Sequence, residues 1–336
     1  MSMAQRWAQE IWSLEETEFL RLLNQGKLAA KNKKVLFYAP SFAHYRTSHH
    51  VSSSAHFPTI SVTGTGCASN CKHCGGKVLQ TMHAAETPDS LVGLCTELKR
   101  KGALGCLVSG GCLPNGSVPL EKFIPAIARI KRDLGLTVFV HTGIVDLATA
   151  ERLKNAGVDA ALIDIIGSDE TIHEICSLNF TVKDYADSLK ALKHAGLNIA
   201  PHVIVGLHHG ELEGEFAALN MIAQCQPSAV VIIAFMSIRG TAMANTKPPA
   251  PAAIAKVVAT ARTLFPETPL VLGCMRPKGR HRGVTDVLAL KAGVDGIAFP
   301  SEEALSFAEN QGYEMAFSSL CCAQIYRDLY GKQLSR

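Results

Sequence analysis

The sequence predicts a parallel α/β barrel of the TIM type, a (βα)8 fold, with an extension at each end of the chain. From residue 59 onward, short apolar and β-branched runs alternate with longer segments of helical period, which is typical of repeated βα units. We count eight such units, the number that closes a barrel. The chain has 336 residues, 47% of them hydrophobic, which is enough for one such core. We therefore expect an N-terminal extension over 1–58, a barrel over 59–300 and a helical tail over 301–336.

The expected elements follow in order along the chain. Strands are predicted at 59–63, 104–109, 137–141, 160–165, 198–205, 229–235, 270–273 and 296–299. Two helix starts are predicted, at Thr87-Pro88-Asp89 and at the capping-box pattern of Thr181 to Asp184. Helix ends are predicted just before Gly157, Gly196 and Gly293. The N-terminal extension contains an amphipathic helix at 14–23 and a strand-like run at 35–38. We expect both extensions to lie over the mouth of the barrel.

Charge and hydropathy indicate which partners to expect. The net charge of +4 arises from 33 basic and 29 acidic residues, and the basic residues are scattered. The densest run, Lys31, Lys33 and Lys34, is more typical of a solvated loop than of a nucleic-acid site. No apolar stretch reaches the roughly 18 residues of a membrane span, and the first residues lack a secretory pattern. We predict a cytoplasmic protein with neither nucleic-acid nor membrane partners.

Three of the 11 cysteines form a compact motif directly after the first predicted strand. Cys67, Cys71 and Cys74 have the spacing C-x3-C-x2-C. Three thiolates can bind three irons of a 4Fe-4S cluster and leave the fourth without a protein ligand. Such an iron can bind the amino and carboxylate groups of S-adenosylmethionine (SAM) and pass it an electron. We predict that these cysteines are the metal ligands and the catalytic centre.

A zinc site is the alternative for the same motif. Three cysteines and His73 would form a Cys3His ligand set. His73 lies between two of the ligands, where a tetrahedral site would be crowded, and no second C-x2-C pair completes a zinc ribbon. We favour the iron-sulfur cluster.

With this motif after its first strand, the chain resembles the radical SAM superfamily. The family motif has an aromatic residue just before the third cysteine, a place that His73 holds, and the resemblance implies that this ring packs near the adenine of SAM. Ser109, Gly110 and Gly111 occupy the place of a Gly-Gly-Glu type motif that contacts the methionine amino group. Cys112 stands where the family has the glutamate, which leaves this cysteine for another role.

Further SAM contacts are predicted where later strands end. His141 and His202 close strands whose ends point into the cavity, so each is a candidate contact to SAM or substrate. Asp164 either binds the ribose or caps the next helix. By resemblance, Gly206 belongs to a segment that contacts adenine. Arg239 is either a ribose or carboxylate contact or part of a turn.

Within this superfamily the chain resembles the biotin and lipoyl synthase branch, and most closely the two-protein lipoyl synthases of archaea and sulfur-oxidising bacteria. The phrases that carry the resemblance are Phe37-Tyr-Ala-Pro-Ser-Phe42, Ile60-Ser-Val-Thr-Gly64, His73-Cys74-Gly75-Gly76, His141-Thr-Gly143, Asp164-Ile-Ile-Gly167 and Gly273-Cys274-Met-Arg276-Pro277. The resemblance implies sulfur insertion into an octanoyl chain on a lipoyl-domain lysine. It also implies an electron donor and a related radical SAM partner protein.

That branch takes its sulfur from a second, auxiliary cluster. A carbon radical must meet a sulfide within bonding reach, so both clusters must line one cavity. The chain lacks the N-terminal cysteine triplet of single-chain lipoyl synthases. The predicted auxiliary ligands are Cys112, Cys274 and one or both of Cys321 and Cys322. Each could instead be a small buried hydrophobe, which is our interpretation of the remaining cysteines, Cys95, Cys106, Cys176 and Cys225.

Two other functions remain open at this point. One is a different radical SAM reaction on a small molecule, such as biotin-type thiolation, methylation or ring formation. The other is a non-catalytic iron-sulfur or zinc scaffold, which would need no open iron beside a Gly-Gly rim.

Overall fold

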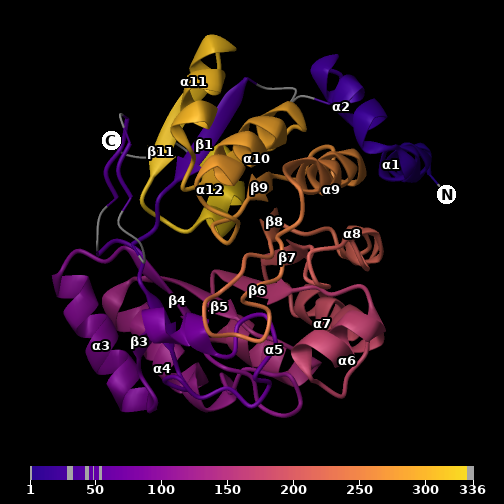
Figure 1. Ribbon diagram of the computed structural model, residues 1–336. Helices are drawn as coiled ribbons and strands as arrows, with labels where there is room; N and C mark the ends of the chain where they lie inside the picture. The colour runs from indigo at the N-terminus through magenta and orange to yellow at the C-terminus, as the bar shows by residue number, and fades with distance from the viewer. Residues whose placement is uncertain (1, 29–32, 42–44, 48, 53–54, 331–336) are drawn as a thin grey trace.

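The computed structural model describes residues 2–28, 33–41, 45–47, 49–52 and 55–330. They form one curled, entirely parallel sheet with helices on its outer face, a half-barrel (Figure 1). The sheet has 11 strands in the order β11-β1-β10-β9-β8-β7-β6-β5-β4-β2-β3. The predicted α/β barrel architecture is confirmed.

The element bounds are as follows. The strands are β1 Lys34–Tyr38, β2 Thr59–Ser61, β3 His83–Ala84, β4 Gly105–Ser109, β5 Thr137–His141, β6 Ala160–Asp164, β7 Ile199–Val205, β8 Val230–Ala234, β9 Leu270–Leu272, β10 Gly296–Ala298 and β11 Glu314–Ser318. The α-helices are α1 Met3–Ser13, α2 Glu16–Asn24, α3 Pro88–Arg100, α4 Ile124–Arg129, α5 Leu147–Asn155, α6 Asp169–Cys176, α7 Val182–His194, α8 Glu215–Ala223, α9 Pro251–Leu264, α10 Arg280–Lys291, α11 Glu302–Asn310 and α12 Ile325–Tyr330.

All eight predicted strands are present, as β2 and β4 to β10. They do not close on one another, however. The last of them, β10, pairs with β1 instead of β2, and β1 pairs in turn with β11. The sheet therefore ends at β3 on one side and at β11 on the other. The strand-like run at 35–38 belongs to β1, which gives β10 a partner from the N-terminal extension.

The N-terminal extension does not cover the mouth with its helices. α1 and α2 pack on the outside of the barrel against α9, as Figure 1 shows at the periphery. Trp12 contacts Phe216 of α8 with ring centroids 5.4 Å apart. Among the described residues of the extension, Tyr45 reaches the rim, where its hydroxyl donates to the carbonyl of Pro300 (2.6 Å). Both helices have an apolar face, and packing that face against the outer helices of the barrel removes it from water.

The C-terminal tail differs from the prediction in structure and place. It contains strand β11 as well as two helices, and its last helix lies inside the curled sheet. Cys322, Ala323 and Ile325 pack with inward-facing residues such as Phe139 and Val231. The Tyr326 hydroxyl donates to the carbonyl of Asp159 just before β6 (3.1 Å). The tail thus fills the lumen of the half-barrel, because an open sheet of this size would otherwise leave its inner face in water.

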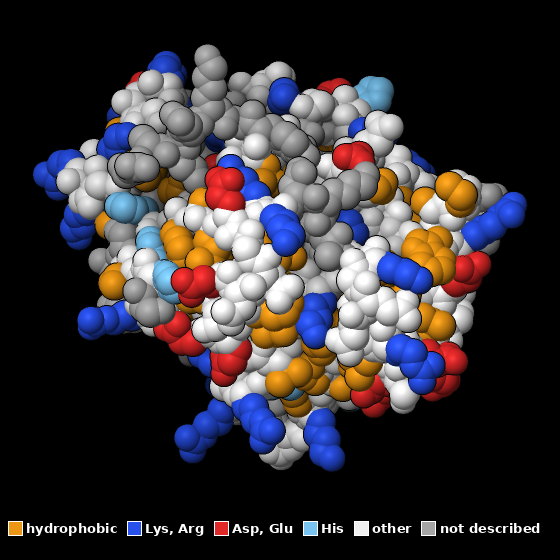
Figure 2. All heavy atoms as spheres, turned by 90° about the horizontal axis from the view of Figure 1, so that it is seen from above, with side chains coloured by type: hydrophobic (Ala, Val, Ile, Leu, Met, Phe, Trp, Pro, Cys, Tyr) orange, Lys and Arg blue, Asp and Glu red, His pale blue; other side chains and the backbone are white. Residues whose placement is uncertain are grey.

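Surface features agree with a scattered charge distribution. In Figure 2, Lys and Arg side chains are spread around the face shown, with apolar side chains between them. Lys31 of the predicted basic run lies outside the described residues. Among the described helices, none combines the length and the apolar character that a membrane span requires. The cytoplasmic location stays a prediction.

Candidate iron-sulfur site

The cysteine loop follows β2 and is fixed on two sides. On one side it meets the rim after β4, where the N–H of Ala68 donates to the carbonyl of Cys112 (2.8 Å). On the other side it meets the end of α6, where the N–H of Lys72 donates to the carbonyl of Ile175 (2.8 Å). These backbone hydrogen bonds set the position of the loop at the carboxyl ends of the strands, the edge where parallel barrels carry their active sites.

Gly111 has a clear steric role in this arrangement. A Cβ atom on Gly111 would come within 2.1 Å of the carbonyl oxygen of Gly66 and 2.6 Å of the Cα of Cys67. The N–H of Gly111 donates to the hydroxyl of Thr63 (2.7 Å), which in turn donates to the carbonyl of Gly66 (2.8 Å). The close approach predicted for this glycine therefore involves the cysteine loop, and only a residue without a side chain fits.

Two thiols and an imidazole come together on the loop. The sulfur atoms of Cys71 and Cys74 and a ring nitrogen of His73 lie within 4.8 Å of one another. His73 is thus not too crowded to reach both thiols, which removes the steric argument made above against a zinc site. Its buried Nδ1 atom has no hydrogen-bond partner among the described residues. A buried polar atom of this kind needs a partner, so the ring is suited to contact a bound group.

The third thiol of the motif has a different neighbour. Cys67 and Cys112 share a hydrogen bond through their side chains, which lowers the pKa of Cys67 to about 5 and, together with burial, raises that of Cys112. Cys67 is therefore the most readily ionised ligand of the motif. Cys112 therefore lies against the cysteine loop.

Cys71 and Cys74 hold their protons in the absence of metal. The pKa of Cys71 is raised to about 12, first by its hydrogen bond with Cys176, and that of Cys74 to about 12, first by its hydrogen bond with Cys71. Metal binding must displace these protons, so loading of the site releases acid. Cys176, which we interpreted as packing alone, is buried and contacts this loop: its carbonyl accepts from the Cys71 thiol (3.6 Å). Its position at the end of a helix gave no sign of this long-range contact.

Three predicted SAM contacts converge in the barrel mouth. His141 is the last residue of β5, Asp164 is the last residue of β6, and His202 lies within β7. One ligand atom from each of these residues lies within 4.8 Å of the other two. Burial opposes ionisation of Asp164, but the charge and hydrogen bond of His141, together with the nearby His202 and His73, outweigh it and hold the pKa of Asp164 at about 2. Burial lowers the pKa of His202 to about 4. At neutral pH the group therefore contains a carboxylate and a neutral imidazole.

The other predicted contacts lie around this centre. Ser109 is nearly buried at the end of β4, with its hydroxyl 3.4 Å from the carbonyl of His141. Gly206 has a φ of +72°, and a Cβ atom there would meet the ring of Pro249 at 2.7 Å. The N–H of Gly206 donates to the carboxylate of Glu215 (2.7 Å), a buried residue that the sequence analysis missed. Arg239 is exposed in the loop after β8.

A second group of thiols occupies the lumen. Cys274 follows β9, and Cys321 and Cys322 precede α12. Burial and then the charge of Cys321 raise the pKa of Cys274 to about 11, while hydrogen bonding between Cys321 and Cys322 lowers the pKa of the first and raises that of the second. These three cysteines, three of the four predicted auxiliary ligands, belong to the same apolar cluster inside the curled sheet.

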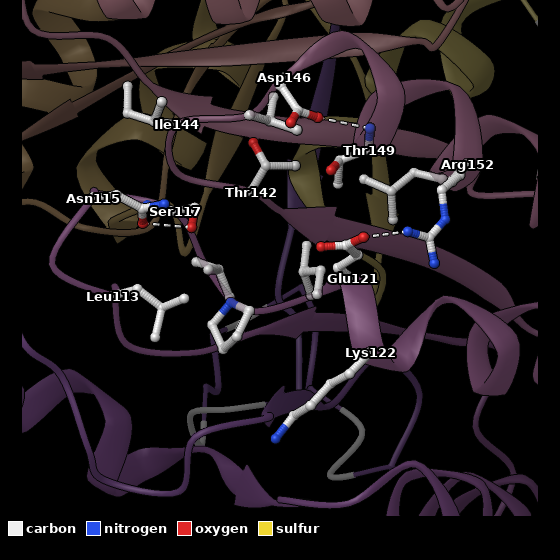
Figure 3. Close-up of a pocket in the computed structure, with 15 residues that line it drawn as sticks. Leu113, Asn115, Ser117, Glu121, Lys122, Thr142, Ile144, Asp146, Thr149 and Arg152 are labelled. Carbon is white, nitrogen blue, oxygen red and sulfur yellow. Dashed lines mark hydrogen bonds and ion pairs between the residues drawn. The ribbon is translucent and has the colours of Figure 1, made fainter.

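A pocket of about 590 Å³ lies beside the rim, between the loops after β4 and β5 and helix α5 (Figure 3). Its floor is apolar, with Leu113, Ile144 and other aliphatic side chains. Arg152 and Glu121 form an ion pair at its edge. None of the predicted site residues lines it. It is a separate cavity next to the mouth.

The region that contains the cysteine loop matches a known protein family. The family model described as the radical SAM superfamily matches residues 61–219, which include the whole cysteine loop. Residues 61–219 belong to the radical SAM superfamily. Three thiols on one loop beside a buried imidazole nitrogen without a partner fit the 4Fe-4S cluster and SAM that this family uses. The match over residues 61–219 supports a radical SAM enzyme.

Individual relatives agree with this domain. The chain is 25% identical to a biotin synthase of Prochlorococcus marinus (strain MIT 9301) over 251 residues, covering 72% of this chain and 73% of the relative. It is 26% identical to a biotin synthase of Cenarchaeum symbiosum (strain A) over 240 residues, covering 69% and 73%.

Two solved structures share the fold. A crystal structure of methylornithine synthase superposes with a TM-score of 0.62 at 16% identity, covering 93% of this chain and 94% of that one. HydG, a maturase of the [FeFe]-hydrogenase, gives a TM-score of 0.63 at 15% identity over 96% and 76%.

Proposed function

We propose that this radical SAM enzyme inserts sulfur at an unactivated carbon of an octanoyl chain carried on a lipoyl-domain lysine. The observation that carries the proposal is the second group of thiols, Cys274, Cys321 and Cys322. Cys274 follows the carboxyl end of β9 as the cysteine loop follows that of β2, so both groups belong to the same edge of one parallel sheet. A thiolating enzyme needs two sets of soft ligands facing one cavity.

The roles of the residues follow from their places. Cys67, Cys71 and Cys74 would hold the first cluster, which would supply SAM with the electron needed for hydrogen abstraction. His73 packs against the adenine, and Ser109, Gly110, Gly111, Gly206 and Arg239 form the remaining wall around SAM. Cys274, Cys321 and Cys322 hold an auxiliary cluster. Apolar lumen residues such as Phe139 and Leu162 exclude water, which protects a reactive carbon centre from side reactions.

Cys112 has a different role in this proposal. Its thiol lies against Cys67, and its carbonyl accepts from Ala68 of the cysteine loop. We assign it to positioning of the first cluster site in place of the auxiliary cluster.

A related radical SAM partner protein and an electron donor complete the proposed reaction. The support for the partner is the resemblance to two-protein lipoyl synthases in the phrases around the cysteine loop and Cys274. Each protein then adds one sulfur at one carbon.

Biotin-type thiolation is the second candidate. The curated relatives named above are biotin synthases that align with about seven-tenths of this chain. The same two thiol groups would serve that reaction, with a small ring precursor in place of the acyl chain.

One experiment separates the candidates. The protein is reconstituted anaerobically with iron and sulfide, reduced, and incubated with SAM and either an octanoyl-lysyl lipoyl-domain peptide or dethiobiotin. We expect 5'-deoxyadenosine and a gain of one sulfur in the peptide. Sulfur gained only by dethiobiotin selects the second candidate, and the absence of 5'-deoxyadenosine from fully loaded protein overturns both.

Matched variants make the assay specific. The Cys274→Ala/Cys321→Ala variant should still form 5'-deoxyadenosine but transfer no sulfur, since only the auxiliary ligands are removed. Cys225→Ala, a buried thiol hydrogen-bonded to the carbonyl of Ile222 (3.0 Å), is the control and should retain both products. Sulfur transfer by the double variant contradicts the assignment of the auxiliary ligands.

A further inference from the structure

Two groups of described residues outside the cysteine loop bring three His, Asp or Glu ligand atoms within 4.8 Å of one another. One is His141, Asp164 and His202; the other is Glu170, Glu174 and His208. The first lies in the barrel mouth on three adjacent strands, and the second lies near the surface on α6 and the loop after β7. Only the first is held by the sheet itself.

The sheet directs the three side chains to the same side. Asp164 of β6 is directly paired with His202 of β7, and His141 of β5 is paired with Leu162 of β6, two residues before Asp164. Residues two apart on a strand point to the same face, so His141 and Asp164 lie on one side of the sheet. The rings of His141 and His202 are 5.9 Å apart between centroids. This preorganisation distinguishes the group from side chains that meet by chance on a surface.

The separation of the ligand atoms suits a coordination sphere better than a hydrogen bond. Nε2 of His141 is 3.5 Å from Oδ1 of Asp164, at the long limit for a hydrogen bond. Two ligand atoms each about 2.1 Å from a tetrahedral ion are about 3.4 Å apart, which follows from the bond lengths of zinc sites. The observed distance therefore leaves room for an ion between the two side chains.

A backbone contact fixes one of the imidazoles. Nδ1 of His202 lies 3.0 Å from the carbonyl oxygen of Ala200. A carbonyl is an acceptor only, so Nδ1 carries the proton and donates, and Nε2 keeps its lone pair. This is the arrangement that metal-binding histidines use, because it sets both the tautomer and the ring orientation.

From these observations we propose that His141, Asp164 and His202 bind a divalent first-row transition-metal ion in the barrel mouth, in addition to the iron-sulfur sites. Two imidazoles and one carboxylate form a ligand set with open positions, the type that binds Fe²⁺ and related ions. The second oxygen of Asp164 and the open positions stay available to an oxygen or nitrogen donor of SAM or substrate. The site goes beyond sulfur insertion and does not depend on it.

The test uses the holoenzyme with its clusters oxidised. Mn²⁺ is added, and free Mn²⁺ is followed by its electron paramagnetic resonance signal. Thiolates prefer softer ions than Mn²⁺, so binding at the cysteine groups is avoided. We expect one Mn²⁺ per chain, with affinity weakened about tenfold or more in His202→Gln and in Asp164→Asn. The iron content and melting temperature of each variant verify that it is folded. If His202→Gln or Asp164→Asn does not fold, His141→Gln is tested in its place.

Glu170→Gln is the matched control because it removes a carboxylate from the surface group. It should bind Mn²⁺ as the unchanged protein does. The proposal is overturned if the unchanged protein binds no Mn²⁺ at millimolar concentration, if Asp164→Asn and His202→Gln retain full affinity, or if binding is lost in Glu170→Gln. Because the readout is metal binding, a failure of sulfur insertion leaves this result unaffected.

Discussion

The guanidinium of Arg276 and the carboxylate of Asp286 form a fully buried ion pair joined by two parallel hydrogen bonds, of 2.8 and 2.9 Å. Arg276 also donates to the carbonyls of Gly273, Ala298 and Phe299. It therefore ties the end of β9 to the end of β10 and fixes the loop that carries Cys274. Every N–H of the Arg276 guanidinium is directed at an acceptor, and a charged group can be buried only when its hydrogen bonds are satisfied in this way.

Removal of this arginine should strongly destabilise the protein. Arg276→Met leaves the carboxylate of Asp286 buried without its partner, which costs about 3–5 kcal/mol in free energy of unfolding. Urea denaturation under anaerobic conditions measures it. The double variant Arg276→Met/Asp286→Leu should recover much of the loss, and Arg6→Met, on an exposed face of α1, should stay within about 0.5 kcal/mol. Equal stability of Arg276→Met and the unchanged protein contradicts the prediction.

Gly111 should prove necessary for loading of the cluster. In Gly111→Ala the new methyl group meets the carbonyl of Gly66 at 2.1 Å, so the cysteine loop must move. We expect lower iron content after reconstitution and a lower melting temperature. Gly93→Ala is the control, because a Cβ atom in this part of α3 meets nothing within 4 Å. That change should keep the iron and add up to about 1 kcal/mol of stability. Full iron content in Gly111→Ala is the contrary result.

Two groups of thiols should give two independent iron counts. Replacement of Cys67, Cys71 and Cys74 by alanine should remove about half of the iron and sulfide and leave the auxiliary cluster. Further replacement of Cys274, Cys321 and Cys322 should remove the rest. Anaerobic iron and sulfide analysis measures both steps, with Cys225→Ala as the control. A first variant without any iron would contradict the auxiliary site.

Glu215 should make stability depend on pH. Burial raises its pKa from 4.5 to about 7, so the folded chain binds this proton more tightly than the unfolded chain does. The resulting stability is present below the unfolded pKa and is lost as pH rises through about 7. The melting temperature should fall from about pH 5 to about pH 8, and Glu215→Gln should remove that part of the decrease. The exposed Glu97→Gln is the control. Identical pH profiles of Glu215→Gln and the unchanged protein contradict the assignment.

Local patterns in the sequence predicted the barrel strands well. The run at 137–141 matches β5 in both bounds, and the capping box of Thr181 and Asp184 begins α7 as expected. Helical and strand periods are set by neighbouring residues, so they are visible along the chain. The places of β1, β11 and α12 were not predicted, because they depend on which distant apolar surface each segment covers.

The candidate site shows the same division. The spacing of Cys67, Cys71 and Cys74 was sufficient to propose a cluster site, since three candidate ligands on one short loop need no tertiary information. The contact of Cys112 with Cys67 could not be predicted, because it arises where two loops from neighbouring strands meet. For the same reason, the contact of Cys176 with Cys71 had no signal in the sequence.

The sequence by itself determined the parallel α/β class, the eight barrel strands and the candidate ligands Cys67, Cys71 and Cys74, because each depends on residue types at fixed local spacing. Only the tertiary structure decided that the sheet stays open, that the tail fills its lumen, and that Cys274, Cys321 and Cys322 share one apolar cluster. These features follow from burial of apolar surface between segments far apart in the chain, and this burial has no fixed spacing along the sequence.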